Sequence, residues 1–599
     1  MDEHDLRRLI GWVRQGRLSR RGFIRRMAAV GLTAPLANQL LAIGGVAMAQ
    51  PASDYKPTKR GGGGTLKLLW WQAPTLLNPH FAVGTKDQDG SRLFYEPLAA
   101  WDDQGNLKLV LAAEVPSIEN GGLAEDGTSV TWKLKQGVKW HDGEPFTAAD
   151  VVFNWQYASE PKTAAVTAGS YNYLKAVEKL DQYTVKVTFS KPTPFWADPF
   201  VSSNGCLIPK HLFEPYIGAK SREAPANLKP VGTGPYKFQS FTPGDSVAGV
   251  INTDYYQPNR PYFDEVQMKG GGDATSAARA VLESAEYDYA WNLQVEDQLL
   301  KKMETAGRGR VMFTKGANIE HMQFNFTDPN KEVDGERSSI KTTHPTLSDP
   351  VVRQALSLLI DRGSVQQYIY GRTGETTSNY LNGPPRFVSQ DTKWEFNIQK
   401  ATDLLDKAGW KPGTDGIREK DGKKLSYLFQ TSINQPRQET QQIIKQACKK
   451  AGIDIRLKAV LASVYFSSDT GNDDTYPKFY TDLQMYTTNP PQPDPGFWMQ
   501  SFLSSQVASK ANKWQGRNIT RWQNADYDRI YAETVKELDP VKRAAQFIQL
   551  NDLVINNVVV IPVIFRKGVG AAVNGLHARL SGWDNDTWDL ADWYKETRT

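Results

Sequence analysis

Segments with helical and with strand periodicity alternate along most of this chain of 599 residues, and this alternation most restricts its fold. A helix through Cys448 is followed by Gly452 and then by a strand over 453–459, in which apolar and charged residues alternate. Residues 558–565 are almost wholly apolar, which predicts a strand covered on both faces. Helices and strands that alternate without a fixed repeat length predict an α/β fold whose sheets are covered by helices.

The first fifty residues have the charge asymmetry of a signal peptide. Six arginines precede an uncharged stretch over 27–50, and residues 19–24 (SRRGFI) resemble the twin-arginine export motif. Small residues around Ala49 predict cleavage after that position. We therefore expect residues 1–49 to be a signal peptide that directs export to the periplasm, followed by a flexible leader at 50–64. An uncleaved membrane anchor is the alternative.

The charge of the remaining chain argues against nucleic acid as a partner. Eight Arg and three Asp or Glu lie in the first 49 residues, which leaves 63 residues of each charge. A body of zero formal charge offers no basic surface for phosphate groups. Two cysteines exclude a disulfide framework and a thiolate metal cluster, although one bond between Cys206 and Cys448 stays open.

Motifs of catalysis and of cofactor binding are missing from the sequence. The seven histidines never have the spacing of a zinc site, and no H-E-x-x-H, G-x-S-x-G or Walker A sequence occurs. We expect no metal, no cofactor and no catalysis. An exported hydrolase or oxidoreductase that folds around a cofactor before export is the rival class, because twin-arginine routing would suit it.

One block of sequence carries a specific resemblance. Residues 137–151 (GVKWHDGEPFTAADV) closely resemble the most recognisable block of the bacterial extracellular solute-binding proteins, family 5, which include dipeptide- and oligopeptide-binding proteins of ABC importers. Within it, Thr147 and Asp150 predict a capped helix that begins at Ala148. Further similar blocks follow in the family's order and span the mature chain: 208–211, 231–236, 252–256, 349–355, 360–362, 401–410 and 518–530.

The resemblance implies a two-lobed periplasmic binding protein-like clamp of three domains, with the ligand cleft at the hinge. By this analogy the second lobe is formed by residues 320–565. The first lobe combines a core domain with one inserted domain. The core domain is formed by residues 65–100, 215–315 and 566–599, and the inserted domain by residues 101–214.

The same resemblance selects candidate ligand contacts at the ends of the first-lobe strands. Trp70 and Trp71 end a predicted strand over 65–71, and alternation places them on opposite faces, so we expect Trp71 to face the cleft. Trp291 and Asn292 lie in a segment similar to the one that leaves a strand beside the ligand in the family. Asn325 lies between two phenylalanines where the chain first crosses into the second lobe, and is a candidate hinge or pocket amide.

Residues 486–498 occupy the position of the family's main ligand-recognition loop, and Tyr486, Asn489, Asp494 and Trp498 are its candidate contacts. In peptide-binding members a carboxylate on this loop pairs with the ligand's α-amino group. This sequence has the neutral Asn489 there, which cannot form the charge-assisted bond that holds an ammonium, a loss of about 1.5–3 kcal/mol. Peptide specificity is therefore uncertain from the sequence.

These features predict the solute-binding component of an ABC importer. Peptide-like solutes come first on family frequency, and an oligosaccharide or an opine-like conjugate is the alternative, since aromatic faces stack on sugar rings and apolar side chains alike. Arg386 is a candidate partner for a ligand carboxylate. The expected partners are the solute and an inner-membrane permease, with the protein itself a monomer. A periplasmic chaperone that uses the same cleft has no separate sign in the sequence.

Overall fold

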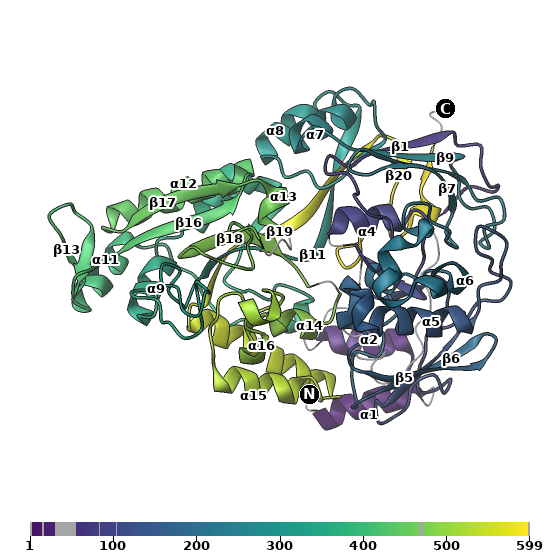
Figure 1. The fold of residues 1–599 in the computed structure, drawn as a ribbon, viewed down its shortest axis with the longest axis horizontal. Coiled ribbons are helices and arrows are strands. Elements are labelled where there is room, and N and C mark those ends of the chain that lie inside the picture. The colour runs from purple at the N-terminus through teal and green to yellow at the C-terminus, as the bar shows by residue number, and fades with distance from the viewer. Residues whose placement is uncertain are drawn as a thin grey trace.

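The computed structural model describes residues 3–14, 17–29, 55–82, 84–103, 105–466, 471–490 and 492–596. It is a mixed α/β protein, as predicted, in which two halves are joined through a shared central sheet (Figure 1). In this described part of the chain, no helix is long and apolar enough to span a bilayer. The predicted cleavage position after Ala49 lies outside the described residues.

The central sheet extends through both halves of the molecule. The middle strands are two long antiparallel neighbours, β11 and β19, whose register shifts between Thr314 and Asn318 and again between Glu320 and His321. On each side of them lie parallel pairs, β1 with β10 and β9 in one half and β16 with β17 and β18 in the other. In sheet order the strands are β17 (Asp454–Val460), β16 (Ser426–Ser432), β18 (Leu483–Thr488), β11 (Gly309–Phe324), β19 (Val560–Val573), β10 (Tyr289–Ala290), β1 (Thr65–Leu69), β9 (Glu265–Lys269), β8 (Ser246–Ile251) and β7 (Tyr236–Thr242), with β12 (Gly374–Thr376) paired to β19.

The helices cover this sheet and fill the space beside it. In the half that contains β1 they are α4 (Thr85–Ser91), α7 (Ala274–Leu282) and α8 (Asp297–Glu304), and in the other half α9 (Pro350–Ser357), α11 (Ile398–Lys407), α12 (Gln435–Lys450), α15 (Ala525–Thr534) and α16 (Pro540–Asn556). The shorter elements are α10 (Arg362–Ser364), α13 (Ala462–Tyr465), α14 (Gly496–Met499), β2 (Ala99–Trp101), β3 (Leu107–Leu109), β13 (Lys411–Pro412), β14 (Arg418–Lys420), β15 (Lys423–Lys424), β20 (Leu576–His577) and β21 (Tyr594–Lys595). Helices α1 (Glu3–Arg14) and α2 (Arg20–Ala29) pack on each other through a small apolar cluster.

A separate three-stranded antiparallel sheet belongs to the half with β1. It contains β4 (Ser129–Lys133), β6 (Thr184–Phe189) and β5 (Leu174–Asp181) and packs with α5 (Ala148–Ser159) and α6 (Lys210–Phe213) nearby. Helix α5 begins at Ala148, as predicted. Thr147 accepts a hydrogen bond from a backbone N–H of the first turn, and the Asp150 carboxylate accepts from the Thr147 N–H, so the predicted capping pair is confirmed.

The two cysteines do not pair. Cys206 lies in the apolar core around β1, and Cys448 lies in the core between α12 and β16, and both are buried free thiols. Burial raises the pKa of the Cys206 thiol to about 11 and that of Cys448 to about 12. The disulfide that the sequence left open is therefore absent, because each thiol packs as a small apolar side chain in a different core.

Two predicted element ends differ from the structure. Strand β1 ends at Leu69, two residues before the predicted end, and helix α9 ends at Ser357 although apolar periodicity continues to Ile360. Beyond these ends Trp70 and residues 358–360 are buried and Trp71 is half-buried, so the apolar pattern indicates burial and does not mark the end of the hydrogen-bonded element. Residues 560–564 of β19 are buried throughout, as the apolar run predicted.

A glycine in one of the resembling blocks is required by a close backbone approach. A Cβ atom at Gly232 would overlap the carbonyl oxygen of Phe94. We expect Gly232→Ala to lower the free energy of unfolding by about 2–4 kcal/mol, because neighbouring backbone must move. Urea unfolding followed by circular dichroism measures this. Gly84→Ala, where a Cβ has no neighbour within 4 Å, is the control and is expected to change little.

Candidate functional site

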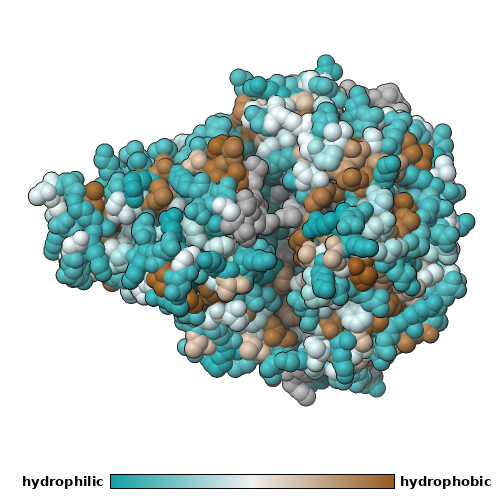
Figure 2. Space-filling model, viewed as in Figure 1, coloured by the Kyte–Doolittle hydropathy of each residue, from teal (hydrophilic) through white to brown (hydrophobic). Residues whose placement is uncertain are grey.

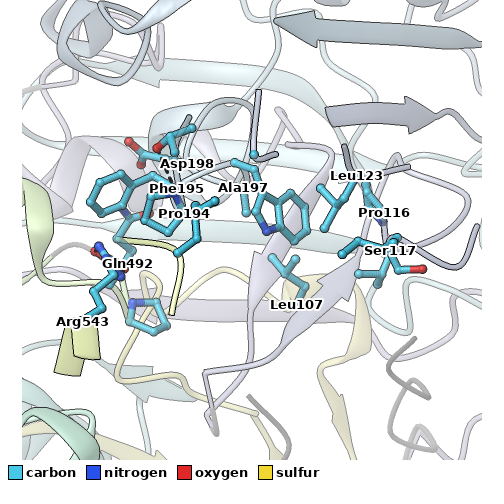
Figure 3. Close-up of a pocket in the computed structure, with 18 of the residues that line it drawn as sticks. Leu107, Pro116, Ser117, Leu123, Pro194, Phe195, Ala197, Asp198, Gln492 and Arg543 are labelled. Atoms are coloured by element: carbon cyan, nitrogen blue, oxygen red, sulfur yellow. Dashed lines mark hydrogen bonds and ion pairs between the residues drawn. The ribbon is translucent and has the colours of Figure 1, made fainter. Parts of the chain in front are cut away.

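A pocket of about 220 Å³ lies between the two halves, because its lining comes from both. Trp101, residues within 105–129 and residues 193–198 form one wall, and 386–387, 492–494, Leu538 and Arg543 form the other. A crevice between the halves is also visible on the surface (Figure 2). Asp198, Gln492 and Arg543 gather at one end of the pocket and apolar side chains at the other (Figure 3). Such a mixture of apolar walls and a few polar groups is typical of a small-molecule site.

Two of the predicted contacts, Asp494 and Arg386, line this pocket. The Asp494 carboxylate forms a two-pronged ion pair with the Arg543 guanidinium, in which Nη2 donates to Oδ1 at 2.9 Å, and Oδ1 also accepts from the Gly496 N–H at 2.8 Å. The Arg543 guanidinium lies 4.5 Å from the centre of the Phe195 ring on the opposite wall. Asp494 therefore holds the recognition loop in place and has little capacity left for a ligand cation.

Arg386 is placed differently. Its Nη1 is buried and has no hydrogen-bond partner in the described part of the chain. Burial lowers the pKa of Arg386 to about 9, and the nearby Asp494 charge opposes this effect. A guanidinium with an unused donor beside a pocket favours a carboxylate or another planar anion.

Trp71, Trp291 and Asn292 come together at the carboxyl ends of β1 and β10. The Trp71 indole N–H donates to the Asn292 carbonyl oxygen at 3.2 Å, and the Trp71 and Trp291 ring centres are 6.5 Å apart. Trp70 is fully buried and stacks on Trp291, while Trp71 stays half-buried. Asn292 has φ +52°, which turns the chain sharply after β10. The two neighbouring tryptophans therefore differ in burial, although both rings contact Trp291.

The second half contributes an aromatic wall from β18 and the loop after it. Tyr486 is 9% exposed and contacts the rings of His321, Tyr465 and Tyr476. Burial lowers the pKa of His321 to about 4, so this ring is neutral at physiological pH.

The other two loop candidates differ in exposure. Trp498 is buried and stacks on Tyr380 at 4.2 Å between ring centres. Asn489 is exposed, and its amide donates to the neighbouring Pro490 carbonyl at 3.2 Å. Trp498 therefore packs in the core of its half, whereas Asn489 is open to solvent.

Asn325 does not face a pocket in the structure. Its side chain is fully buried, and its amide nitrogen donates to Ser338 Oγ and to the Phe479 and Thr481 carbonyls, while its oxygen accepts from Thr327. All these bonds are internal. Asn325 therefore joins the end of β11 to neighbouring loops, which is the buried-amide role that a strand asparagine can take instead of ligand contact.

A buried charge network supports the recognition loop from behind. Glu320 on β11 pairs with Arg437 on α12 at 2.9 Å, and both side chains are at most 5% exposed. Thr487 of β18 donates to Glu320 at 2.6 Å and accepts from Arg437 and Arg566. The network links the crossing strands β11 and β19 to the strand that precedes the loop.

The sequence analysis did not identify three residues near the pocket. Asp198 and Gln492 line it, and Arg517 lies with its guanidinium 3.5 Å from the centre of the Phe497 ring. The segment around Asp198 reads PFWADPF, and an acidic residue among aromatic residues and prolines is a signal that could have indicated it. Gln492 and Arg517 carry no comparable signal. In the described ranges, no group of three or more His, Cys, Asp or Glu residues is placed to hold a metal ion.

Comparison with known proteins agrees with this architecture. The chain is 30% identical over 407 residues to the oligopeptide-binding protein AppA of Bacillus subtilis, which covers 66% of this chain and 69% of AppA. It is 24% identical over 502 residues to the glutathione-binding protein GsiB of Escherichia coli (strain K12). This match covers 83% of this chain and 88% of GsiB. The solved structure of AppA from Bacillus subtilis in complex with a nonapeptide matches with a TM-score of 0.74 at 24% identity, covering 90% of this chain and 100% of that one.

The family profile described as bacterial extracellular solute-binding proteins, family 5 Middle, matches residues 111–510. That range contains Arg386, Gln492 and Asp494 of the second-half wall and most of the pocket lining from the first half, whereas Leu538 and Arg543 lie beyond it. The chain therefore belongs to the family 5 bacterial extracellular solute-binding proteins.

Proposed function

We propose that the protein captures a peptide-like solute between its two halves and delivers it to the permease of an ABC importer. The observation that carries this proposal is the pocket whose walls come from both halves and which contains the unpaired donor of Arg386. A solute that contacts both walls stabilises the closed arrangement over an open one, and this differential affinity is all the mechanism requires. The protein itself needs no catalytic step and no cofactor.

Direct contacts between the halves support the clamp. Besides the pocket, Asn434 donates to Gln294 at 2.7 Å and Gln435 donates to Glu296 at 2.6 Å, and each bond joins α12 and its N-terminal cap to the segment before α8. Arg372 also pairs with Asp297 at 2.7 Å and with Glu304 at 2.8 Å across the two halves. These contacts are polar, so they can be exchanged for water when the halves separate. We propose that the first lobe consists of residues 65–100, 215–315 and 566–599 together with the insert 101–214. The second lobe consists of residues 320–565.

Charged groups favour a peptide-like solute over a neutral oligosaccharide. Arg386 and Asp198 both line the pocket, and burying them against a neutral sugar would leave both charges without a partner. The named relatives bind oligopeptide and glutathione, which are peptide-like. An opine-like conjugate also carries charged groups and remains a test compound for the same site.

The arginine pair of the N-terminal segment supports a route of export. We propose export to the periplasm by the twin-arginine pathway through residues 19–24, with removal of residues 1–49, and action as a monomer. Replacing Arg20 and Arg21 together with lysine is expected to keep the precursor in the cytoplasm, because that pathway reads the arginine pair. Cell fractionation measures this, and periplasmic accumulation of the double variant would contradict the route.

Native mass spectrometry of the purified mature protein tests the function. A random peptide library is offered together with a mixture of oligosaccharides and opines, and the captured compounds are identified. We expect peptides to be retained and to raise the melting temperature in proportion to their affinity. Retention of oligosaccharides alone would contradict the peptide-like solute, and chemical turnover of a captured compound would contradict a purely binding role.

A further inference from the structure

The pocket between the halves contains a carboxylate that no cation neutralises. Asp198 lines the pocket from the first half, at the polar end shown in Figure 3. Among the residues that the structure describes, no Lys, Arg or His nitrogen lies within 4.0 Å of its oxygens. The two other charged groups nearest to it in the pocket, Asp494 and Arg543, are already paired with each other.

The groups around Asp198 are mostly unable to replace a cation. The Tyr173 hydroxyl donates to its Oδ2 at 3.1 Å, and the Gln492 amide hydrogen-bonds to it from the opposite wall. Asp494 adds a second negative charge that raises the pKa of Asp198, and the positive charge of Arg517 opposes this more weakly. Burial, reinforced by Asp494, raises the pKa of Asp198 to about 7. A carboxylate in this environment binds its proton more tightly because no cation stabilises its charge.

The chemistry of this environment fits an amino group better than a metal ion. Asp494 has both oxygens engaged by Arg543 and Gly496, so a metal would find one free carboxylate, one amide and one hydroxyl. Hard cations bind where several oxygens converge, whereas an ammonium needs only one carboxylate and neutral acceptors. The aromatic face of Phe195 in the same pocket also suits a cationic nitrogen.

We propose that Asp198 binds a positively charged amino group of the captured solute, a role that the neutral Asn489 of the recognition loop cannot perform. The inference rests on the proposed function and specifies its solute as one with a free amine. Arg386 on the opposite wall of the same pocket then accepts a negative group of the solute. The two together select a zwitterionic solute.

The position of Asp198 also couples binding to closure. Asp198 belongs to the first half, and Asp494 and Gln492 belong to the second, so closing the halves brings two carboxylates toward each other. Arg543 neutralises Asp494, so a solute amine in the closed pocket is attracted by Asp198 without a competing charge pair. A solute held at Asp198 and against the second-half wall contacts both halves and therefore favours closure, which is the differential affinity that a delivery protein needs.

The test is a competition between peptides with and without a free amine. A lysine-free random pentapeptide library and the same library acetylated at the α-amino group are mixed in equal amounts and offered to the wild-type protein. The captured peptides are counted by mass spectrometry. We expect the free-amine form to be enriched about tenfold to hundredfold, the ratio that loss of one charge-assisted hydrogen bond produces.

Asp198→Asn is the test variant and Glu286→Gln is its control. Both remove one negative charge from the first half, but Glu286 is exposed and is not among the residues that line the pocket. We expect Asp198→Asn to lose the preference for the free amine and Glu286→Gln to keep it. Thermal unfolding is expected to show that Asp198→Asn folds as well as wild type, because the substitution removes repulsion with Asp494.

Each outcome decides one statement. Equal capture of both libraries by the wild type, or an unchanged preference in Asp198→Asn, overturns the role of Asp198 while peptide capture still stands. Capture of neither library overturns the proposed function and this inference with it. Loss of the preference in both variants shows long-range charge attraction and overturns a direct contact.

The pH dependence adds an independent readout of Asp198. A protonated Asp198 has no charge to offer, so the free-amine enrichment is expected to fall as the pH decreases from about 7.5 to about 5.5. The groups that face Asp198 are Tyr173, Gln492, Asp494 and Arg517. Asp198→Asn removes only the Asp198 carboxyl, so a pH dependence that persists in this variant comes from the other groups. An enrichment in the wild type that stays constant over this range overturns the assignment.

Discussion

Glu320→Gln is expected to lower the free energy of unfolding by about 3–5 kcal/mol. The carboxylate is 1% exposed and is the ion-pair partner of Arg437, and it also accepts a hydrogen bond from Thr487. Glutamine has nearly the same shape but no charge, so the Arg437 and Arg566 guanidinium groups would stay buried with no negative partner. Urea unfolding at neutral pH measures the loss.

A surface ion pair is the control for this prediction. Asp334 and Lys341 are paired, but both side chains are about two-thirds exposed, so Asp334→Asn is expected to leave the unfolding midpoint unchanged. Adding Arg437→Met to Glu320→Gln is expected to restore part of the lost stability, because it removes one of the unpaired charges. Equal midpoints for Glu320→Gln and the wild type would show that the buried pair contributes nothing.

Arg543→Met is expected to weaken both the fold and solute capture. The substitution keeps an unbranched apolar chain but removes the partner of Asp494, whose carboxylate holds the start of α14 through the Gly496 N–H. Because Asp494 is about one-fifth exposed, we expect a stability loss of about 2–3 kcal/mol, below the range for a fully buried pair. The loop that carries Asn489 loses an anchor, so peptide affinity should fall about tenfold.

A double-mutant cycle separates the ion pair from the packing of the arginine stem. Arg543→Met combined with Asp494→Asn is expected to be more stable than Arg543→Met alone, because no unpaired charge remains. Calorimetric melting and peptide titration follow the four proteins of the cycle. Purely additive effects in stability would mean that Arg543 acts through its contacts with the Phe195 and Phe547 rings and not through the Asp494 charge.

Local features were predictable from the sequence because neighbours in the chain determine them. The Thr147 and Asp150 cap needs only four consecutive residues. The α/β class follows in the same way from periodicity. The family was recognisable because ordered blocks carry many such local requirements at once.

The candidate site was only partly predictable, because its contacts join residues that are far apart in the chain. Arg386 and Asp494 line the interlobe pocket, but the sequence could not show that Arg543, 49 residues later, already occupies the Asp494 carboxylate. It also could not show that the Asn325 amide nitrogen donates to Ser338 and to the carbonyl of Phe479, which lies 154 residues away. Whether a polar side chain is free for a ligand depends on partners that only the folded chain supplies.

The amino-acid sequence by itself determined the fold class, the capped helix at Ala148 and the family, since each depends on short-range patterns. The tertiary structure alone decided that Cys206 and Cys448 stay apart and that Asp198 faces the opposite half without a cation. Pairing and isolation of charges are long-range properties. They arise when segments distant in sequence are buried together, because burial makes an unpaired charge costly and favours its protonation or its pairing with a ligand.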